Sequence, residues 1–192
     1  MRRDANPTIL FVPGLRDHVE DHWQTHQARA IPGSATVEPL DADRLSRAAR
    51  VGALDAALKA IPGEVILVAH SAGCLTTVHW ALAPTRRIRA GLLVTPADIE
   101  NPLPAGYPEM ADLKVGGWMP IPRRTLPFPT LVVASRNDPL CAFERVAGFA
   151  DAWGAALHDA GDVGHLNPAA GYGPWPEVTA LLHRLDQNAA GG

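Results

Sequence analysis

Four short, nearly continuous apolar runs constrain the fold of this chain more than any other feature. The four runs span residues 8–12, 65–69, 90–94 and 130–134. Strands buried on both faces of a parallel sheet have this pattern, because helices cover both sides of such a sheet. The runs therefore predict a mostly parallel sheet in an α/β fold.

Helical patterns separate these runs. Between residues 43 and 61, apolar side chains recur near helical spacing, and Pro62-Gly63 provides a stop signal. Further helices are predicted over residues 74–83, 140–153 and 175–187, and weaker strands over 35–37 and 155–158. The alternation predicts a doubly wound sheet of five or six strands with helices on both faces.

Composition and charge are those of one globular domain. Of the 192 residues, 47% are hydrophobic and 19% are charged, so burial can offset the conformational entropy lost on folding. We expect a single domain over residues 1–192, with a flexible tail at 188–192. The formal net charge of -3 provides no broad basic field, so nucleic acid and membrane surfaces are not expected partners.

Neither a targeting segment nor a cysteine framework is evident. The apolar run after Arg2 and Arg3 is too short for a secretory signal and ends at Pro13. No apolar stretch reaches the roughly 20 residues of a membrane helix. Cys74 and Cys141 lack the spacing of a disulfide framework or zinc cluster. A cytoplasmic protein is the expectation.

Reactive residue types follow the runs, where the predicted strands end. Ser71 lies in the segment 69–73, Ala-His-Ser-Ala-Gly, while Asp138 and His165 follow two later strands. Ligands of open α/β sheets bind outside the carboxyl ends of the strands, so these side chains are expected to converge. The chain order serine, aspartate, histidine is that of α/β-hydrolases.

Each of these residues meets a requirement of nucleophilic catalysis. A neutral serine hydroxyl needs a base, for which His165 is the candidate, and Asp138 would orient the imidazole. A developing oxyanion needs two backbone donors, for which the N–H groups of Ala72 and Leu15 are the candidates.

The serine turn departs from the usual pattern at one position. Glycine commonly stands two residues before such a serine, whereas this chain has Ala69. We therefore expect close packing around the Ala69 methyl group, with Ser71 still accessible.

Other residues are weaker candidates for the same site. Asp98 also follows a strand end and is the rival of Asp138. His18 and His22 are near enough for a substrate role, but the stretch reads as a solvated, capped helix start without a metal motif, so neither metal nor cofactor is expected. Structural or exposed roles are predicted for Cys74 and for His70, His79, His158 and His183.

Residues 97–129 break the alternation of strand and helix. They contain seven prolines and no long helical pattern. Loops of this length in compact domains are commonly functional, and prolines restrict the chain. We predict an ordered strap over the site with Trp118 as a wall of the substrate pocket. The alternative is a loop that only seals a sheet edge.

Five segments together carry a resemblance to a known family. They are residues 13–15 with 22–24, 69–73, 120–124 with 126–129, 135–139 and 164–167. In combination they resemble the small α/β-hydrolases that include the retinoblastoma-binding-protein-nine and YdeN-type serine hydrolases. The resemblance implies a compact domain without a large cap, a triad of Ser71, Asp138 and His165, and ester hydrolysis without a cofactor.

The leading hypothesis is a serine hydrolase that cleaves small carboxylic esters through an acyl-enzyme. An amidase or acyltransferase with the same serine remains an alternative, as does a non-catalytic interaction module on a hydrolase scaffold. The expected ligand is a small-molecule ester, and a protein partner is not indicated.

Overall fold

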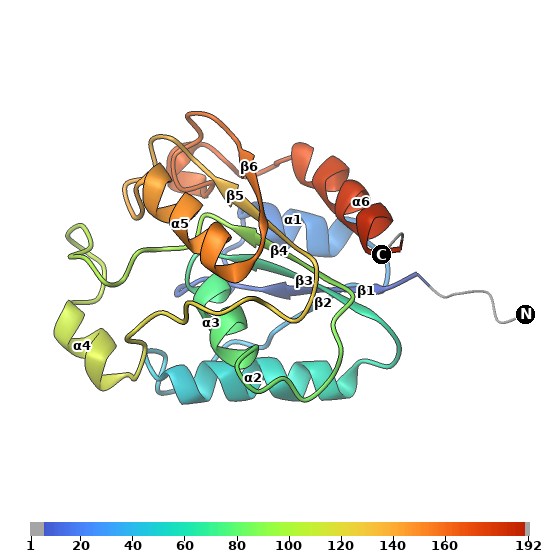
Figure 1. The fold of residues 1–192 in the computed structure, drawn as a ribbon, viewed down its shortest axis with the longest axis horizontal. Helices are drawn as coiled ribbons and strands as arrows, with labels where there is room; N and C mark the ends of the chain where they lie inside the picture. Colours follow the sequence, from blue (N-terminus) through green and yellow to red (C-terminus); the bar gives the residue numbers. More distant parts are fainter. Residues whose placement is uncertain (1–5, 191–192) are drawn as a thin grey trace, which may run out of the picture.

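The structure is a computed structural model that describes residues 6–190, built around one six-stranded sheet (Figure 1). The strand order is β2-β1-β3-β4-β5-β6, and all five pairings are parallel. The strands are β1 Thr8–Val12, β2 Ala35–Thr36, β3 Val65–His70, β4 Ala90–Val94, β5 Thr130–Ala134 and β6 Ala156–Asp159. The predicted α/β fold with a mostly parallel sheet is confirmed.

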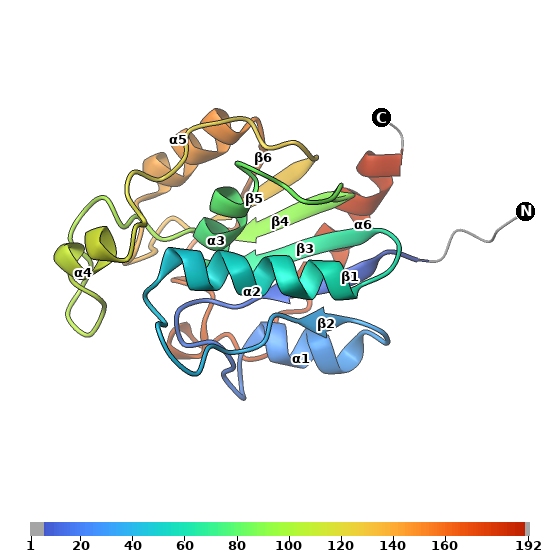
Figure 2. The same cartoon turned by 90° about the horizontal axis from the view of Figure 1, so that it is seen from below.

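Helices cover both faces of this sheet, which gives three layers (Figures 1 and 2). The helices are α1 Trp23–Ala30, α2 Arg47–Ala60, α3 Ala72–Trp80, α4 Met110–Val115, α5 Phe143–Trp153 and α6 Glu177–Ala190, with a short 3-10 helix at Pro168–Ala170. Helices α2, α3 and α5 pack on one face, and α1 and α6 pack on the other.

Two hydrophobic cores lie on opposite sides of the sheet because side chains alternate along each strand. In β3, Val65 and Leu67 enter the core with α2 and α3, whereas Ile66 and Val68 enter the core with α1 and α6. All six residues of β3 are buried. Burial on both faces explains why the sequence shows a continuous apolar run rather than an alternating one.

Helix α1 follows the first strand, as the predicted capped helix start implies. His22 is its N-cap, and the His22 Nδ1 accepts a hydrogen bond from the Gln24 N–H at 3.2 Å. The prediction of a solvated stretch is wrong for His22, which is buried against Trp23 and His70. The local sequence looks polar, but the end of the sheet covers this side chain.

The proline-rich segment contains one short helix, α4, which lies beyond the carboxyl ends of the central strands (Figure 2). The chain after α4 returns alongside the sheet to the start of β5 (Figure 1). Ion pairs hold the start of the segment. The Glu100 carboxylate lies 2.7 Å from both Arg123 and Arg145, and it accepts from the Ile121 N–H at 2.8 Å. The segment is therefore cross-linked to itself and to α5.

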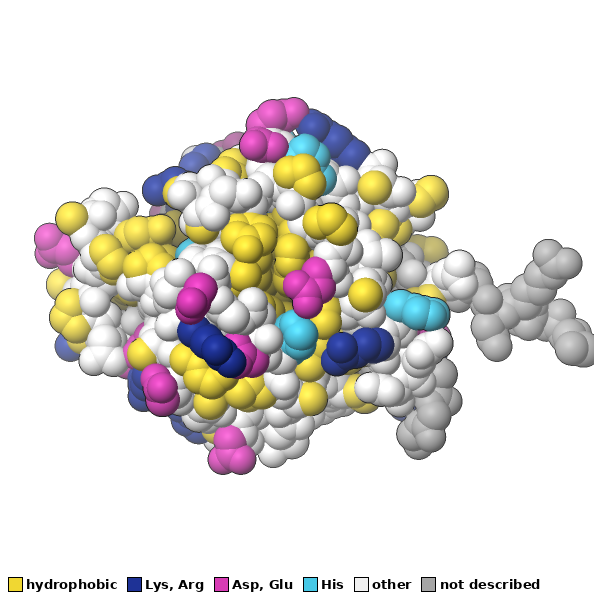
Figure 3. All heavy atoms as spheres, turned by 90° about the horizontal axis from the view of Figure 1, so that it is seen from above, with side chains coloured by type: hydrophobic (Ala, Val, Ile, Leu, Met, Phe, Trp, Pro, Cys, Tyr) yellow, Lys and Arg dark blue, Asp and Glu magenta, His cyan; other side chains and the backbone are white. Residues whose placement is uncertain are grey.

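The chain end differs from the predicted flexible tail. Helix α6 continues to Ala190, so residues 188–190 are helical, and residues 191–192 lie outside the described part of the chain. No described helix is both long enough and apolar enough to cross a bilayer. In the view from above, acidic and basic side chains are interspersed across the surface (Figure 3).

Helix α3 approaches β1 so closely that only glycine fits at the contact. A Cβ on Gly73 would lie 2.1 Å from the Val12 carbonyl oxygen and 2.7 Å from that of Pro13. Both obstacles are backbone atoms, so a side chain could be admitted only if α3 moved away from the sheet. The β3–α3 turn is thus held against the end of β1.

We expect Gly73→Ala to destabilise the protein strongly because the methyl group would clash with backbone, and overpacking costs about 1–3 kcal/mol or more. Gly52→Ala is the matched control: it lies in α2 with no atom within 4 Å of the added Cβ. That variant should gain about 0.5–1 kcal/mol from helix propensity. Urea denaturation of both variants measures the difference, and equal stabilities would contradict the close approach.

Candidate active site

Ser71 occupies the turn between β3 and α3 in a backbone conformation that few residues adopt. Its φ is 55° and its ψ is -121°, and it is the residue that precedes the first turn of α3. Positive φ at a residue with a side chain is costly and persists where the surroundings enforce it. Ala69, two residues earlier, is fully buried in the core, as the expected close packing of its methyl group requires.

Asp138 and His165 are brought together from the loops after β5 and β6. The His165 Nδ1–H donates to both carboxylate oxygens of Asp138, at 2.9 and 3.0 Å. Both residues are buried, and the Leu140 N–H donates to the same carboxylate at 2.9 Å. The ring orientation of His165 is therefore determined by a buried, charge-assisted contact.

Further hydrogen bonds join these two loops. The Asn137 side-chain oxygen accepts from the Gly164 N–H at 2.6 Å, directly beside the two paired residues. On the other side, the Trp23 indole N–H of α1 donates to the Leu166 carbonyl at 3.0 Å. The residues on both sides of His165 are thus hydrogen-bonded, Gly164 to Asn137 and Leu166 to Trp23. These bonds fix the backbone that carries the imidazole.

The second ring nitrogen of His165 has no partner. Its Nε2 is buried and makes no hydrogen bond within the described residues. Because Nδ1 carries the hydrogen that it donates to Asp138, Nε2 carries the free lone pair of the neutral ring. His165 and Ser71 both line a cavity of about 680 Å³.

Asp98, the rival carboxylate, is engaged elsewhere. Arg145 of α5 donates to its two oxygens at 2.8 and 3.0 Å, and the Asn101 amide donates at 2.7 Å. Burial alone would raise the pKa of Asp98, but the hydrogen bonds from Arg145 and Asn101 bring it below its ordinary value. Of the two candidates, Asp138 contacts His165.

Three imidazoles lie in a row along the cavity wall, edge-on or tilted to one another, a feature that the sequence did not predict. The ring centroids of His22 and His70 are 4.6 Å apart, and those of His70 and His165 are 4.9 Å apart. The His70 Nε2–H donates to the His165 carbonyl at 2.9 Å. Burial lowers the pKa of His22 to about 4 and holds the pKa of His70 well below its usual range, with further lowering from the His165 charge.

Arg50 of α2 holds the loop after β1 through several hydrogen bonds. Its guanidinium donates to the carbonyls of Gly14 at 3.3 Å and Leu15 at 3.0 Å, and it pairs with Asp17 at 3.2 Å. Arg50 and the Asp17 side chain are both almost fully buried. One buried guanidinium thus holds three successive points of the loop, although Asp17 Oδ2 makes no hydrogen bond within the described residues.

Trp118 lies against a second, smaller cavity of about 40 Å³ that also reaches Ser71. Its indole N–H donates to the Leu45 carbonyl at 2.7 Å, and its own carbonyl accepts from His79 at 3.1 Å. Trp118 therefore lies beside Ser71, where we expected it. The His79 side chain holds the Trp118 backbone in place through this hydrogen bond.

The remaining candidates lie away from the reactive groups or are buried as neutral side chains. His158 pairs with Glu177, and His183 contacts Gln187 on α6. Burial raises the pKa of the Cys74 thiol, whose S–H donates to the Val94 carbonyl at 3.3 Å. Among residues 6–190, no group of three or more His, Cys, Asp or Glu side chains is arranged to hold a metal ion.

Comparisons with known proteins identify the family of this chain. A family model described as serine hydrolase matches residues 9–184. A putative YdeN-like hydrolase from Pectobacterium atrosepticum is similar in structure, with 31% identity, a TM-score of 0.80, and coverage of 95% of this chain and 91% of that chain. A search of curated sequences found no significant match.

Two more distant structures share the fold. The ydeN gene product of B. subtilis is 16% identical with a TM-score of 0.72, covering 94% of this chain and 98% of its own. Est1E from Butyrivibrio proteoclasticus is 12% identical with a TM-score of 0.69, covering 100% of this chain and 91% of its own. The fold is that of the α/β-hydrolases. Within that class, this chain belongs to the serine hydrolase family.

The lowered pKa of His22 predicts a loss of stability in acid. The pKa of His22 is near 6.5 in the unfolded chain and about 4 in the folded protein. Between these two pH values, His22 is protonated in the unfolded chain but neutral in the folded protein. The unfolding free energy should therefore fall by about 2–3 kcal/mol between pH 7 and pH 4.5 from this group. His22→Asn retains a helix-capping side chain and should reduce that loss.

Urea denaturation at both pH values measures this effect, with His183→Asn as the control because His183 is exposed on α6. The control should lose as much stability as the wild type. If His22→Asn also lost as much as the wild type, His22 would not be the group responsible.

Proposed function

We propose that this serine hydrolase cleaves small carboxylic esters through an acyl-enzyme, with Ser71 as nucleophile, His165 as base and Asp138 as the orienting carboxylate. One observation carries the proposal most directly. The unpartnered, buried Nε2 of His165 belongs to the same cavity wall as Ser71, while Nδ1 is held by Asp138. A base that accepts the serine proton on one ring nitrogen while a carboxylate holds the other is what activation of a neutral serine hydroxyl requires.

In the acylation step, the Ser71 oxygen attacks the ester carbonyl carbon as His165 Nε2 takes the hydroxyl proton. The carbonyl π electrons move to oxygen and form a tetrahedral oxyanion. When the carbon–oxygen single bond breaks, His165 gives the proton to the departing alkoxide, which leaves as alcohol. Asp138 stabilises the imidazolium that exists between these two transfers.

The oxyanion is assigned to the backbone N–H groups of Ala72 and Leu15. Ala72 is the first residue of α3, so its N–H has no acceptor within the helix, and the helix N-terminus favours negative charge. The Leu15 N–H shares a peptide unit with the Gly14 carbonyl, which Arg50 holds. Because N–H and C=O point in opposite directions across a trans peptide, Arg50 directs the Leu15 N–H away from α2.

Deacylation repeats the same chemistry with water. His165 removes a proton from a water molecule as the water oxygen attacks the acyl carbon. The Ser71 oxygen then leaves with the proton that His165 returns. The product is a carboxylic acid, and both enzyme groups regain their starting protonation. The proposed cycle requires no redox partner.

A fluorophosphonate probe tests the nucleophile. The probe should label the wild-type protein stoichiometrically, and Ser71→Ala should abolish labelling because the attacking oxygen is gone. Ser34→Ala is the control, since Ser34 lies after α1 and only donates to the Ala28 carbonyl. Mass spectrometry of intact protein and of peptides locates the adduct. A folded wild type that stays unlabelled would refute the proposal.

Removing the orienting charge tests the carboxylate. Asp138→Asn should lower kcat for an aryl ester by about 10⁴-fold, the scale seen when a triad carboxylate is replaced by its amide. Asp98→Asn is the matched control, because it removes a buried carboxylate that pairs with Arg145 instead of His165. Circular dichroism checks that both variants fold. A reversal of the two effects would transfer the role to Asp98.

A further inference from the structure

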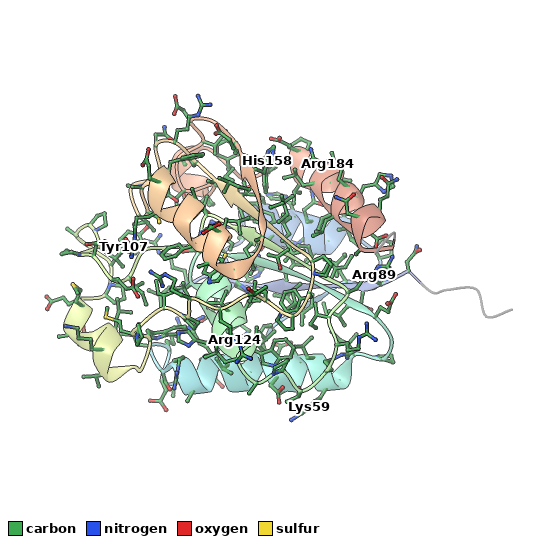
Figure 4. The ribbon with its side chains drawn as sticks, viewed as in Figure 1. Lys59, Arg89, Tyr107, Arg124, His158 and Arg184 are labelled. Carbon is green, nitrogen blue, oxygen red and sulfur yellow. The ribbon has the colours of Figure 1, made fainter. Side chains whose placement is uncertain are left out.

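Two cavities of very different size meet at Ser71. The larger, about 680 Å³, and the smaller, about 40 Å³, share Leu15, Ser71 and Tyr107 in their walls. His165 lines the larger cavity, whereas Ala72 lines the smaller one. Figure 4 labels Tyr107 in the segment that leads to α4. The site is therefore divided into two compartments that differ in the catalytic groups they contain.

The chemistry of the proposed reaction assigns the two compartments. The leaving alcohol must receive a proton from His165, so its oxygen must lie on the side of Ser71 where that ring is. The acyl group stays on the serine and must extend elsewhere. From this division we propose that the small cavity is the acyl subsite, and that the enzyme acts on esters of short, unbranched acyl groups with larger alcohols. This assignment rests on the proposed function.

The volume of the small cavity sets the length of the acyl chain. The small cavity has about 40 Å³, against about 680 Å³ for the larger one. The smaller space therefore suits the short side of an ester. The larger cavity holds a group many times that size, which places the bulky part of the substrate on the alcohol side.

The walls of the small cavity determine its polarity. Apolar side chains from α3, α4 and the strap surround it, among them Leu75, Ile99, Leu113 and Trp118. Arg50 also reaches the wall, but its guanidinium is occupied by the loop after β1 and by Asp17. A charged acyl group would lose its hydration there without gaining a free partner. The acyl group is therefore a neutral aliphatic one.

The cavity has little room to expand. Trp118 is 3% exposed, and both its indole N–H and its carbonyl are hydrogen-bonded, to Leu45 and to His79. The strap that supplies the outer wall is tied to α5 through Glu100 and Arg145 at 2.7 Å. A longer acyl chain must displace packed side chains, which is unfavourable in a well-packed interior. The length limit should be steep.

Two isomeric esters test the assignment with the wild-type protein. Hexyl acetate and ethyl hexanoate have the same atoms but exchange the long and short sides of the ester. Acid release followed by titration at constant pH should give kcat/KM at least about 10-fold higher for hexyl acetate. Equal values, or a preference for ethyl hexanoate, would overturn the subsite assignment.

Enlarging the cavity provides the second arm. Leu113→Ala and Trp118→Ala should raise the ratio of p-nitrophenyl octanoate to p-nitrophenyl acetate turnover at least about 10-fold. Leu126→Ala is the matched control, because Leu126 is a buried leucine of the same segment that lines neither cavity. It should leave the ratio unchanged. Leu113→Ala keeps the test available if the tryptophan variant does not fold.

The outcomes separate this inference from the proposed function. No Ser71-dependent turnover of any ester would refute the proposed function itself. Turnover that depends on Ser71, with an unchanged octanoate-to-acetate ratio in folded Leu113→Ala and Trp118→Ala, would refute only the acyl subsite.

Discussion

The close approach of α3 to the end of β1 is the constraint on which the rest of the site depends. Gly73 lies where any Cβ would meet the carbonyls of Val12 and Pro13. This contact keeps Ser71 beside the loop after β1, where a Cβ on Gly14 would be 3.3 Å from that of Ser71. A hydroxyl, a helix N-terminus and a second backbone segment are thereby brought to one point.

Buried polar groups around that point are compensated by partners from distant parts of the chain. Gln24 of α1 donates to the Val68 carbonyl at 3.0 Å, and Arg50 of α2 joins Asp17. Burying such groups without partners would cost several kcal/mol, so the hydrogen bonds also fix where the loops run. Among the described residues, three buried side-chain atoms make no hydrogen bond: His165 Nε2, Asp17 Oδ2 and His79 Nδ1. Of these three residues, His165 and Asp17 line the larger cavity.

Much of the fold could be predicted because strands buried on both faces have continuous apolar sequences. The runs at residues 8–12, 90–94 and 130–134 coincide with β1, β4 and β5 to the residue, since each strand is apolar on both faces. Helix boundaries were less accurate, by up to four residues, because caps and last turns depend on hydrogen bonds. The burial of His22 could not be predicted, since its neighbours in space are distant in sequence.

The sequence by itself determined the alternation of strands and helices and the order of serine, aspartate and histidine after strand ends. Periodicity and residue type are local properties, so they can be read without coordinates. Only the tertiary structure decided that Asp138 rather than Asp98 contacts His165, because Arg145 of α5 occupies Asp98. It also decided the sizes of the two cavities, since volume depends on how α3, α4 and the strap pack together.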